Sequence, residues 1–296
     1  MSTRLIQKKD YIRFNKKSVK KWYMLFCILL FTTISQATIY YSYQSGNWTT
    51  ANTWTTDPAG TTLLNPAVPT NSDQVVVLAG RTVSLTANVA TTGHSININN
   101  GGILDISTYT ITTIALLEGE GTLRIGKSYF PAVTSNTFIT VNGGMVEYYN
   151  FGAPTTLPTS PTTYYHLSLS NSTVSNYVMN LGSNLTVLGD FTVSATGSGT
   201  LTFGIGDDLA TARTLSFTGN VTIGNSCTMA IGSSSIAQHS ITMSGNFTIN
   251  GTVDLTNNAD YATNTLGAAS LTFTGLSDNT VSINNTNTSF YSFTVN

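Results

Sequence analysis

Adjacent acidic residues are the first candidates for chemistry in this chain. Two carboxylates at a matched separation can hydrolyse a glycosidic bond, and several acids on one face can hold Ca²⁺. Asp207 and Asp208, in the stretch FGIGDDLATA, are the only adjacent acidic pair, and the glycines beside them favour a loop. We expect a solvated acidic turn there, with a Ca²⁺ ligand pair as the alternative, because no GGxGxD-type repeat supports calcium elsewhere.

A second group of charges lies near position 120. Glu118 and Glu120 are followed closely by Arg124 and Lys127, and together they form the densest charge cluster after the N-terminal segment. The spacing predicts a surface patch of salt bridges at a bend, and a catalytic grouping is the alternative.

Residue types that bind metals or act as nucleophiles are scattered. His94, His166 and His239 each lack a Cys, His or acidic companion at ligand spacing, so no metal site is predicted. Cys227 alternates in step with Ile223, which predicts a small buried hydrophobic residue and not a nucleophile.

Aromatic residues gather near position 50, among them Tyr43, Trp48 and Trp54. They could stack on carbohydrate rings, or they could cover the exposed core at the first coil of a solenoid, and we favour the cap. Threonine-rich segments such as TYTITT at 108–113 could present hydroxyl rows to sugars or ice, although β-propensity alone accounts for threonine in strands.

The N-terminal segment carries most of the basic charge. Eight of the 12 basic residues precede Trp22, an apolar run follows to Ile34, and small residues stand at Ser35 and Ala37. This pattern predicts a secretory signal peptide over 1–37, with a membrane anchor as the alternative, and no transmembrane span after cleavage.

Cleavage after Ala37 would leave four basic and twelve acidic residues, a net charge of −8, in a chain that is 41% hydrophobic and 8% charged overall. Such an acidic protein is not expected to bind nucleic acid. One cysteine would remain, which rules out an intrachain disulfide. The composition leaves the oligomeric state open.

Repeated segments define the architecture that must position these residues. LTVLGDFTV, LSFTGNVTI, ITMSGNFTI and LTFTG share one pattern, with glycines at Gly189, Gly219, Gly245 and Gly275. Apolar residues alternate with polar ones on both sides of each glycine, which predicts a strand, a tight bend and a second strand. A two-strand unit cannot bury its own apolar face, so we expect the copies to stack.

The N-terminal half repeats at a shorter step, with glycines at Gly80, Gly102, Gly121 and Gly143. The chain is therefore predicted to be all-β, a right-handed parallel β-helix or closely related β-solenoid with coils of about 20–30 residues. We divide it into the signal peptide, a capped segment over 38–160 and a repeat segment over 161–296. The segments TYYHLSLSN and SFYSFTVN match each other, which predicts a super-repeat and a natural chain that continues past Asn296.

The stretch from SGNWTTANTW to SININNGGILDI, about 45–126, resembles the eight-glycine domain, a β-helix-type module of extracellular proteins. The residues at matching places are Trp48, Trp54, Pro69, Asp73, Gly80, Gly101 and Gly102. The remainder is similar to long repeat-rich secreted proteins of gliding and gut bacteria, many of which carry a C-terminal sorting module. The resemblance implies an extracellular or outer-surface location.

The predicted function is that of a cell-surface structural or adhesive repeat protein, with surface glycans or extracellular matrix as partners. A carbohydrate-active β-helix, either a polysaccharide lyase or a hydrolase, is one alternative, and a carbohydrate-binding module is another. No cofactor is predicted apart from the Ca²⁺ alternative at Asp207 and Asp208.

Overall fold

The computed structural model describes residues 37–151, 154–206, 210–232, 235–256, 267–275, 278–285 and 287–296. Thr38–Asn296 forms one compact unit. Its regular structure is almost entirely strand, and the helical segment among the described residues is the 3-10 turn η1 (Ala51–Thr53). The predicted signal peptide, up to residue 36, lies outside the described residues, as do Asp207 and Asp208.

Two sheets form the first coils. Sheet A has six strands, in the order β10 (Ala132–Asn136), β8 (Ile111–Glu118), β6 (Val89–Ile98), β4 (Gln74–Val77), β1 (Ile39–Ser42) and β3 (Trp54–Thr55). Sheet B has ten strands: β2 (Gly46–Asn47), β5 (Thr82–Ser84), β7 (Ile103–Ser107), β9 (Thr122–Ile125), β11 (Met145–Tyr149), β14 (His166–Asn171), β17 (Phe191–Ala195), β20 (Val221–Ile223), β23 (Phe247–Ile249) and β26 (Val281–Ile283).

Two further sheets replace sheet A in the later coils. Sheet C contains β12 (Thr155–Leu157), β15 (Tyr177–Leu181), β18 (Leu201–Ile205), β21 (Cys227–Ile231), β24 (Thr252–Asp254) and β27 (Thr288–Ser289). Sheet D contains β13 (Thr163–Tyr164), β16 (Leu185–Val187), β19 (Thr214–Phe217), β22 (Gln238–Met243), β25 (Ala268–Phe273) and β28 (Ser292–Val295). Sheet B runs through both parts.

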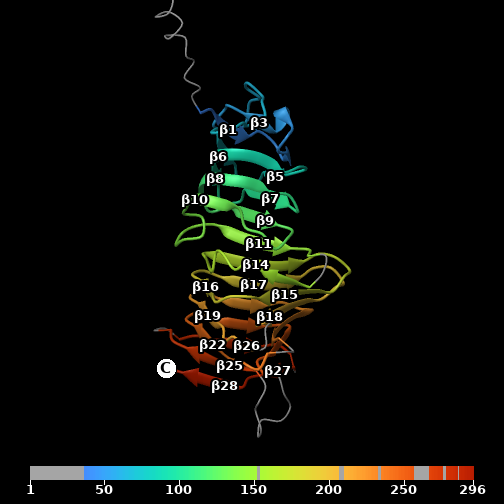
Figure 1. Ribbon diagram of the computed structural model, residues 1–296, viewed down its shortest axis with the longest axis vertical. Helices are drawn as coiled ribbons and strands as arrows, with labels where there is room; N and C mark the ends of the chain where they lie inside the picture. The colour runs from blue at the N-terminus through green and yellow to red at the C-terminus, as the bar shows by residue number, and fades with distance from the viewer. Residues whose placement is uncertain are drawn as a thin grey trace, which may run out of the picture. The chain divides into compact units, whose positions relative to one another are not determined.

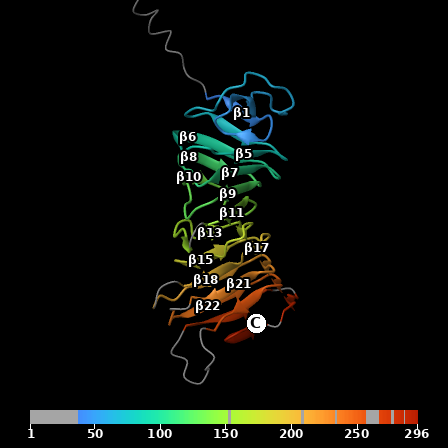
Figure 2. The same cartoon turned by 90° about the vertical axis from the view of Figure 1, so that its right-hand side faces the viewer.

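Neighbouring strands pair in parallel, and the coils lie one above another in both views of the molecule (Figures 1 and 2). The exception among the named strands is β3, which pairs antiparallel with β1 at the N-terminal end. The predicted parallel β-solenoid is therefore confirmed. The right-handed sense stays a prediction, which agrees with the general handedness of parallel crossovers.

Alternation of apolar and polar residues explains why these segments become strands with one buried face. In sheet B, apolar residues of successive coils pair in register and point into a continuous core. This column consists of Val83, Leu104, Leu123, Val146, Leu167, Phe191, Val221 and Phe247, all buried. Each coil thus covers the apolar face of the next, as the stacking argument requires.

The spacing of the coils agrees with the predicted 20–30 residues, with longer coils where the chain carries insertions. Paired positions in sheet B are 19 and 23 residues apart at Asp105, Arg124 and Glu147. Later in the stack, corner residues are 24, 30, 26 and 34 residues apart at His166, Asp190, Asn220, Asn246 and Thr280.

Each predicted structural glycine lies at a corner between two consecutive strands. Gly80, Gly102, Gly121 and Gly143 lie between sheets A and B, and Gly189, Gly219, Gly245 and Gly275 lie between sheets D and B. The reason for glycine differs between corners. Gly80 has φ +71, whereas a Cβ atom at Gly219 would collide with the backbone of Gly189 in the preceding coil.

Two sequence-based interpretations need correction. Two strands were expected in each copy of the repeat, but the chain that joins one copy to the next forms a third strand, in sheet C, from β12 onward. Tyr165 precedes a strand of sheet B whereas Tyr291 precedes a strand of sheet D, so the two matching segments do not occupy equivalent places in a super-repeat. The predicted boundary at residue 160 falls within the first three-sheet coil, between β12 and β13.

Among the described residues, no helix is both long and apolar enough to cross a membrane.

Candidate functional site

The outer face of sheet B carries the main cluster of charged side chains. Asp105 on β7, Arg124 on β9 and Glu147 on β11 occupy the same register position in three successive coils. Because alternate residues of a strand point to opposite faces, and their neighbours Leu104, Leu123 and Val146 are buried, all three side chains point outward. Stacking thus brings together charges that are far apart in sequence.

Arg124 lies between the two carboxylates. Its Nε atom is 2.8 Å from Oε2 of Glu147, and its Nη1 atom is 3.4 Å from Oδ2 of Asp105. The guanidinium also lies over the ring of Tyr149, 4.2 Å from the ring centroid. The three charged side chains are only 28%, 13% and 17% exposed for Arg124, Asp105 and Glu147, so solvent screens these contacts incompletely.

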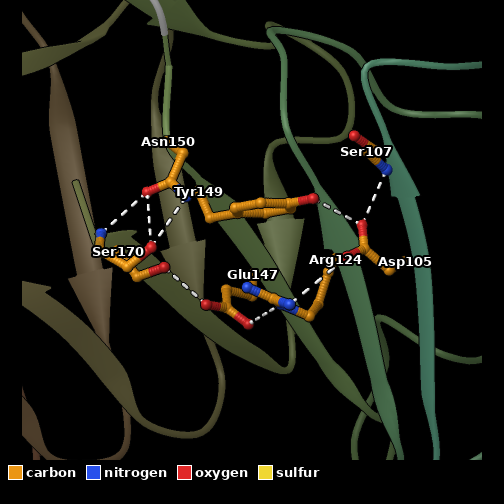
Figure 3. Close-up of polar contacts among 8 residues, drawn as sticks. Asp105, Ser107, Arg124, Glu147, Tyr149, Asn150 and Ser170 are labelled. Carbon is orange, nitrogen blue, oxygen red and sulfur yellow. Dashed lines mark hydrogen bonds and ion pairs between the residues drawn. The ribbon is translucent and has the colours of Figure 1, made fainter. Parts of the chain in front are cut away.

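Further donors complete this arrangement (Figure 3). The Tyr149 hydroxyl donates to Oδ1 of Asp105 at 2.8 Å, and the Ser170 hydroxyl donates to Oε1 of Glu147 at 2.6 Å. Burial raises the pKa of Tyr149, and its hydrogen bond to Asp105 adds to the shift. We refer to Asp105, Arg124, Glu147, Tyr149 and Ser170 as the outer polar cluster.

The outer polar cluster is suited to stabilising sheet B and to presenting hydrogen-bonding groups on its outer face. Both carboxylates are engaged by Arg124 and by at least one hydroxyl group. A carboxylate held in this way must lose a hydrogen bond before it can act as a general base or as a nucleophile.

Hydroxyl groups continue the same outward column beyond Glu147. The strand register aligns Ser168, which is buried at 8% exposure, with Thr192, Thr222, Thr248 and Ser282 on sheet B. Sheet D carries a parallel row, formed by Thr163, Thr186, Ser216, Thr242, Thr272 and Thr294. We refer to these two columns as the hydroxyl rows. The strands of sheet D contain no Asp, Glu, Lys or Arg.

A ladder of short polar side chains lies at the corner between sheets D and B. The backbone N–H of Asn220 donates to Oδ1 of Asp190 at 2.9 Å, that of Asn246 donates to Oδ1 of Asn220 at 3.1 Å, and that of Thr280 donates to Oδ1 of Asn246 at 2.9 Å. This ladder explains why Asp or Asn follows the glycine in three of the repeats. The sequence did not indicate this role of Asp190, because its partner Asn220 lies one coil later.

Glu118 and Glu120 do not form the predicted patch with Arg124. Glu118 ends β8 on sheet A, where its Oε1 atom accepts a hydrogen bond from Nδ2 of Asn97 at 3.1 Å. Arg124 lies on sheet B, beyond the corner that contains Gly121, and its ion-pair partners belong to the adjacent coils. The corner separates residues that are close in sequence. The prediction of salt bridges between these glutamates and Arg124 was therefore wrong.

The proposed ligand-binding role of Trp48 and Trp54 is corrected by their burial. Trp48 is 1% exposed and Trp54 is 0% exposed, so neither ring can stack on a sugar. Their ring centroids are 5.2 Å apart in an edge-to-face arrangement, and Nε1 of Trp54 donates to the backbone oxygen of Trp48 at 2.8 Å. Tyr43 is half-buried beside them and its N–H donates to the Thr53 oxygen. These residues form the N-terminal cap that we favoured.

Ser235 and His239 form a buried serine–histidine pair, which the sequence alone did not indicate. Nε2 of His239 lies 3.0 Å from Oγ of Ser235, and both side chains are buried. However, Nδ1 of His239 accepts the backbone N–H of Arg213 at 3.0 Å, so in the neutral ring the proton is on Nε2. A ring protonated on Nε2 donates to the Ser235 hydroxyl and cannot remove the proton of that hydroxyl. The pair therefore has a structural role, since His239 connects Ser235, before β22, to Arg213, before β19.

The remaining candidates occupy structural positions. Cys227 is buried, as predicted, and burial raises the pKa of its thiol to about 11, which keeps it neutral near pH 7. Nδ1 of His166 accepts the backbone N–H of Asp190 at 2.8 Å. Within the described ranges, no group of three or more His, Cys, Asp or Glu residues is arranged to hold a metal ion.

Comparison with known proteins adds no relatives to this description. No family model matches the chain, and neither a curated protein nor a solved structure shows significant similarity to it.

Proposed function

We propose that this chain is an exported structural and adhesive repeat protein of the cell surface. The observation that carries the proposal is the pair of hydroxyl rows, which run in register along two walls of the stack. The basic and apolar segment before residue 38 supports export, because its pattern is typical of a signal peptide.

The mechanism that we propose is multivalent hydrogen bonding. Paired strands lie about 4.8 Å apart, so each row presents hydroxyl groups at a nearly constant interval along the stack. Each hydrogen bond made to a ligand in water contributes little, about 1 kcal/mol, but many bonds made to one polymer add up. An uncharged polysaccharide fits sheet D, because its strands contain no formal charge that would need to be desolvated.

A binding experiment with insoluble neutral polysaccharides and matrix proteins tests this proposal. We expect Thr242→Glu on sheet D and Thr222→Glu on sheet B to reduce retention at least tenfold, because a carboxylate interrupts each row and stays hydrated. Ala230→Glu on sheet C is the matched control, since it adds the same charge on the outward side of the same coil as Thr222.

Equal loss of binding in the Ala230→Glu control would show that charge alone is responsible, and would contradict the hydroxyl-row mechanism. Turnover of a polysaccharide by the wild-type protein would instead favour the carbohydrate-active alternative. Asp105→Asn and Glu147→Gln would then show whether the outer polar cluster is its active site.

A further inference from the structure

His94 is buried directly beneath the N-terminal cap. It lies on β6, is 0% exposed, and packs edge-on against Trp48 with ring centroids 5.5 Å apart. Its Nδ1 atom donates to the backbone oxygen of Asp73 at 3.1 Å. The Nε2 atom is also buried, and it has no hydrogen-bond partner within the described part of the chain. The neutral ring therefore carries its proton on Nδ1 and turns an unpaired nitrogen toward the cap.

The elements around His94 provide little to stabilise a positive charge. Asp73 is the acidic residue that interacts with the ring, but its carboxylate already accepts the N–H groups of Thr38 and Thr70 and the Thr70 hydroxyl. The neighbouring strand β4 and the cap strands β2 and β3 contain no ionisable side chains, and β1 contributes Tyr40 and Tyr41.

Strand β8, on the other side of β6, has one acidic residue, Glu118, which pairs with Asn97 at the far end of the strand. The uncharged Ile114 lies opposite His94. Burial lowers the pKa of His94, and the backbone and charge of Asp73 oppose this shift only in part. A proton added to Nε2 would therefore be a buried charge without an acceptor, which is strongly unfavourable.

We propose that His94 makes the N-terminal cap acid-labile, so that its protonation releases Trp48 and Trp54 from the end of the stack. The closed cap holds the ring neutral, whereas the opened cap exposes it to water. Opening is thus coupled to the uptake of one proton. The opening equilibrium constant should be independent of pH above about 6.5 and should rise up to tenfold for each pH unit below it.

Opening would also free an edge of sheet A. Strand β3 covers β1 by antiparallel pairing, and the Trp48–Trp54 pair covers the core of the first coil. An unpaired strand edge beside exposed apolar side chains is a template for association with another chain. Acid would therefore promote association through this end of the solenoid.

Tryptophan quenching by acrylamide tests the proposal on the full chain. Trp22→Phe removes the one tryptophan outside the cap, so the emission then reports on Trp48 and Trp54. Between pH 8 and pH 5 we expect quenching to increase below about pH 6.5 in this background. Addition of His94→Gln should abolish the increase, and His166→Gln, which removes a half-exposed histidine, should leave it unchanged. An unchanged pH midpoint with His94→Gln would overturn the proposal.

A proton NMR titration of the wild-type chain decides the question if His94→Gln fails to fold. We expect the His94 ring signals to shift only where the indole N–H of Trp54, which donates to Trp48, loses its protection from exchange. A His94 ring that titrates near pH 6.5 while this N–H stays protected would overturn the proposal.

Discussion

At Gly219 the stack leaves no room for a side chain. A Cβ atom there would collide with the carbonyl group of Gly189, one coil earlier, and a Cβ atom at Gly245 would collide with Gly219 in the same way. Their backbone angles are not in the left-handed region, so the need for glycine at these corners comes from the distance between coils. The repeated dipeptide Gly-Asp or Gly-Asn therefore has two structural causes. The glycine allows the coils to approach closely, and the Asp or Asn side chain forms the ladder between coils.

Substitution of Gly219 tests whether the short distance between coils is what requires glycine at this corner. We expect Gly219→Ala to lower the free energy of unfolding by about 1–3 kcal/mol, because the backbone of the preceding coil must shift. Thr218→Ala, at the exposed neighbouring position, should change it by less than about 0.5 kcal/mol. Urea unfolding followed by circular dichroism gives both values, and equal effects would show that the corner tolerates a side chain.

Arg124 is the residue on which the outer polar cluster depends. We expect Arg124→Met to destabilise the chain by about 2–4 kcal/mol, because Asp105 and Glu147 are largely shielded from water and would lose their shared cation. Arg124→Lys should recover only part of the loss, since an ammonium group cannot make the same fork of contacts or stack on Tyr149.

A double-mutant cycle between Arg124→Met and Glu147→Gln measures the pair directly by urea unfolding. The coupling energy should lie at about 0.5–3 kcal/mol. A coupling energy near zero would mean that the contact with Glu147 adds nothing, which leaves the contact with Asp105 and the packing on Tyr149 as the contributions of Arg124.

At the scale of strands, alternation and glycine spacing were sufficient to predict parallel stacking. Leu215 and Phe217 are buried before the corner, and Val221 and Ile223 are buried after it, as the period of two requires. The number of walls per coil was not predictable in this way. A segment such as Leu201–Ile205 forms a third wall only because the chain turns again, and a two-residue period carries no information about where a coil turns.

The candidate site was less predictable than the fold, for a physical reason. Arg124 meets Asp105 and Glu147 across coils of 19 and 23 residues, so these partners are adjacent only after the strand register is fixed. Glu118 is closer in sequence but lies before a corner, and Glu120 lies within that corner. The burial of Trp48 and Trp54 agreed with the favoured interpretation because the end of a solenoid must be covered.

A buried pair of tyrosines lies in the coil where sheets C and D replace sheet A. Tyr148 on sheet B and Tyr164 on sheet D point into the core, with their hydroxyl groups 3.3 Å apart and their rings edge-to-face. Burial raises the pKa of Tyr164 to about 12 and that of Tyr148 well above its usual value. The folded protein therefore favours the neutral phenols, and this contribution to stability should be lost as the pH rises above about 10.

We expect alkaline destabilisation of the chain between about pH 10 and pH 12, where exposed phenols of the unfolded chain lose their protons first. The part due to Tyr164 is about 2–3 kcal/mol, because burial raises the pKa of its phenol from an ordinary value near 10 to about 12. The double variant Tyr148→Phe with Tyr164→Phe should show a shallower loss in urea unfolding across this pH range. Tyr165→Phe, at a half-exposed ring, is the control. An equal loss of the free energy of unfolding between about pH 10 and pH 12 in all variants would show that the buried tyrosines are not responsible.

At the scale of the whole unit, each coil contacts mainly the coils before and after it. The strand pairings of all four sheets connect successive coils, and sheet B alone runs through the entire series. In such an arrangement, stability is close to a sum of coil terms and neighbour terms, so damage to one coil should spread to its neighbours and weaken with distance. The buried tyrosines lie where sheet A gives way to sheets C and D, which makes that coil the expected boundary between two regions of cooperative unfolding.

Two matched core substitutions test this expectation. Leu104 on β7 and Leu271 on β25 are both 0% exposed, and replacement of either by alanine should cost about 2–5 kcal/mol locally. We expect Leu104→Ala to accelerate amide hydrogen exchange in β4–β9 and Leu271→Ala to accelerate it in β22–β28, as measured by mass spectrometry on proteolytic peptides. In each variant the opposite end should retain wild-type protection, because no strand joins it directly to the damaged coil. If either variant loses protection evenly from β1 to β28, the coils unfold as one cooperative unit and the nearest-neighbour description does not hold for this chain.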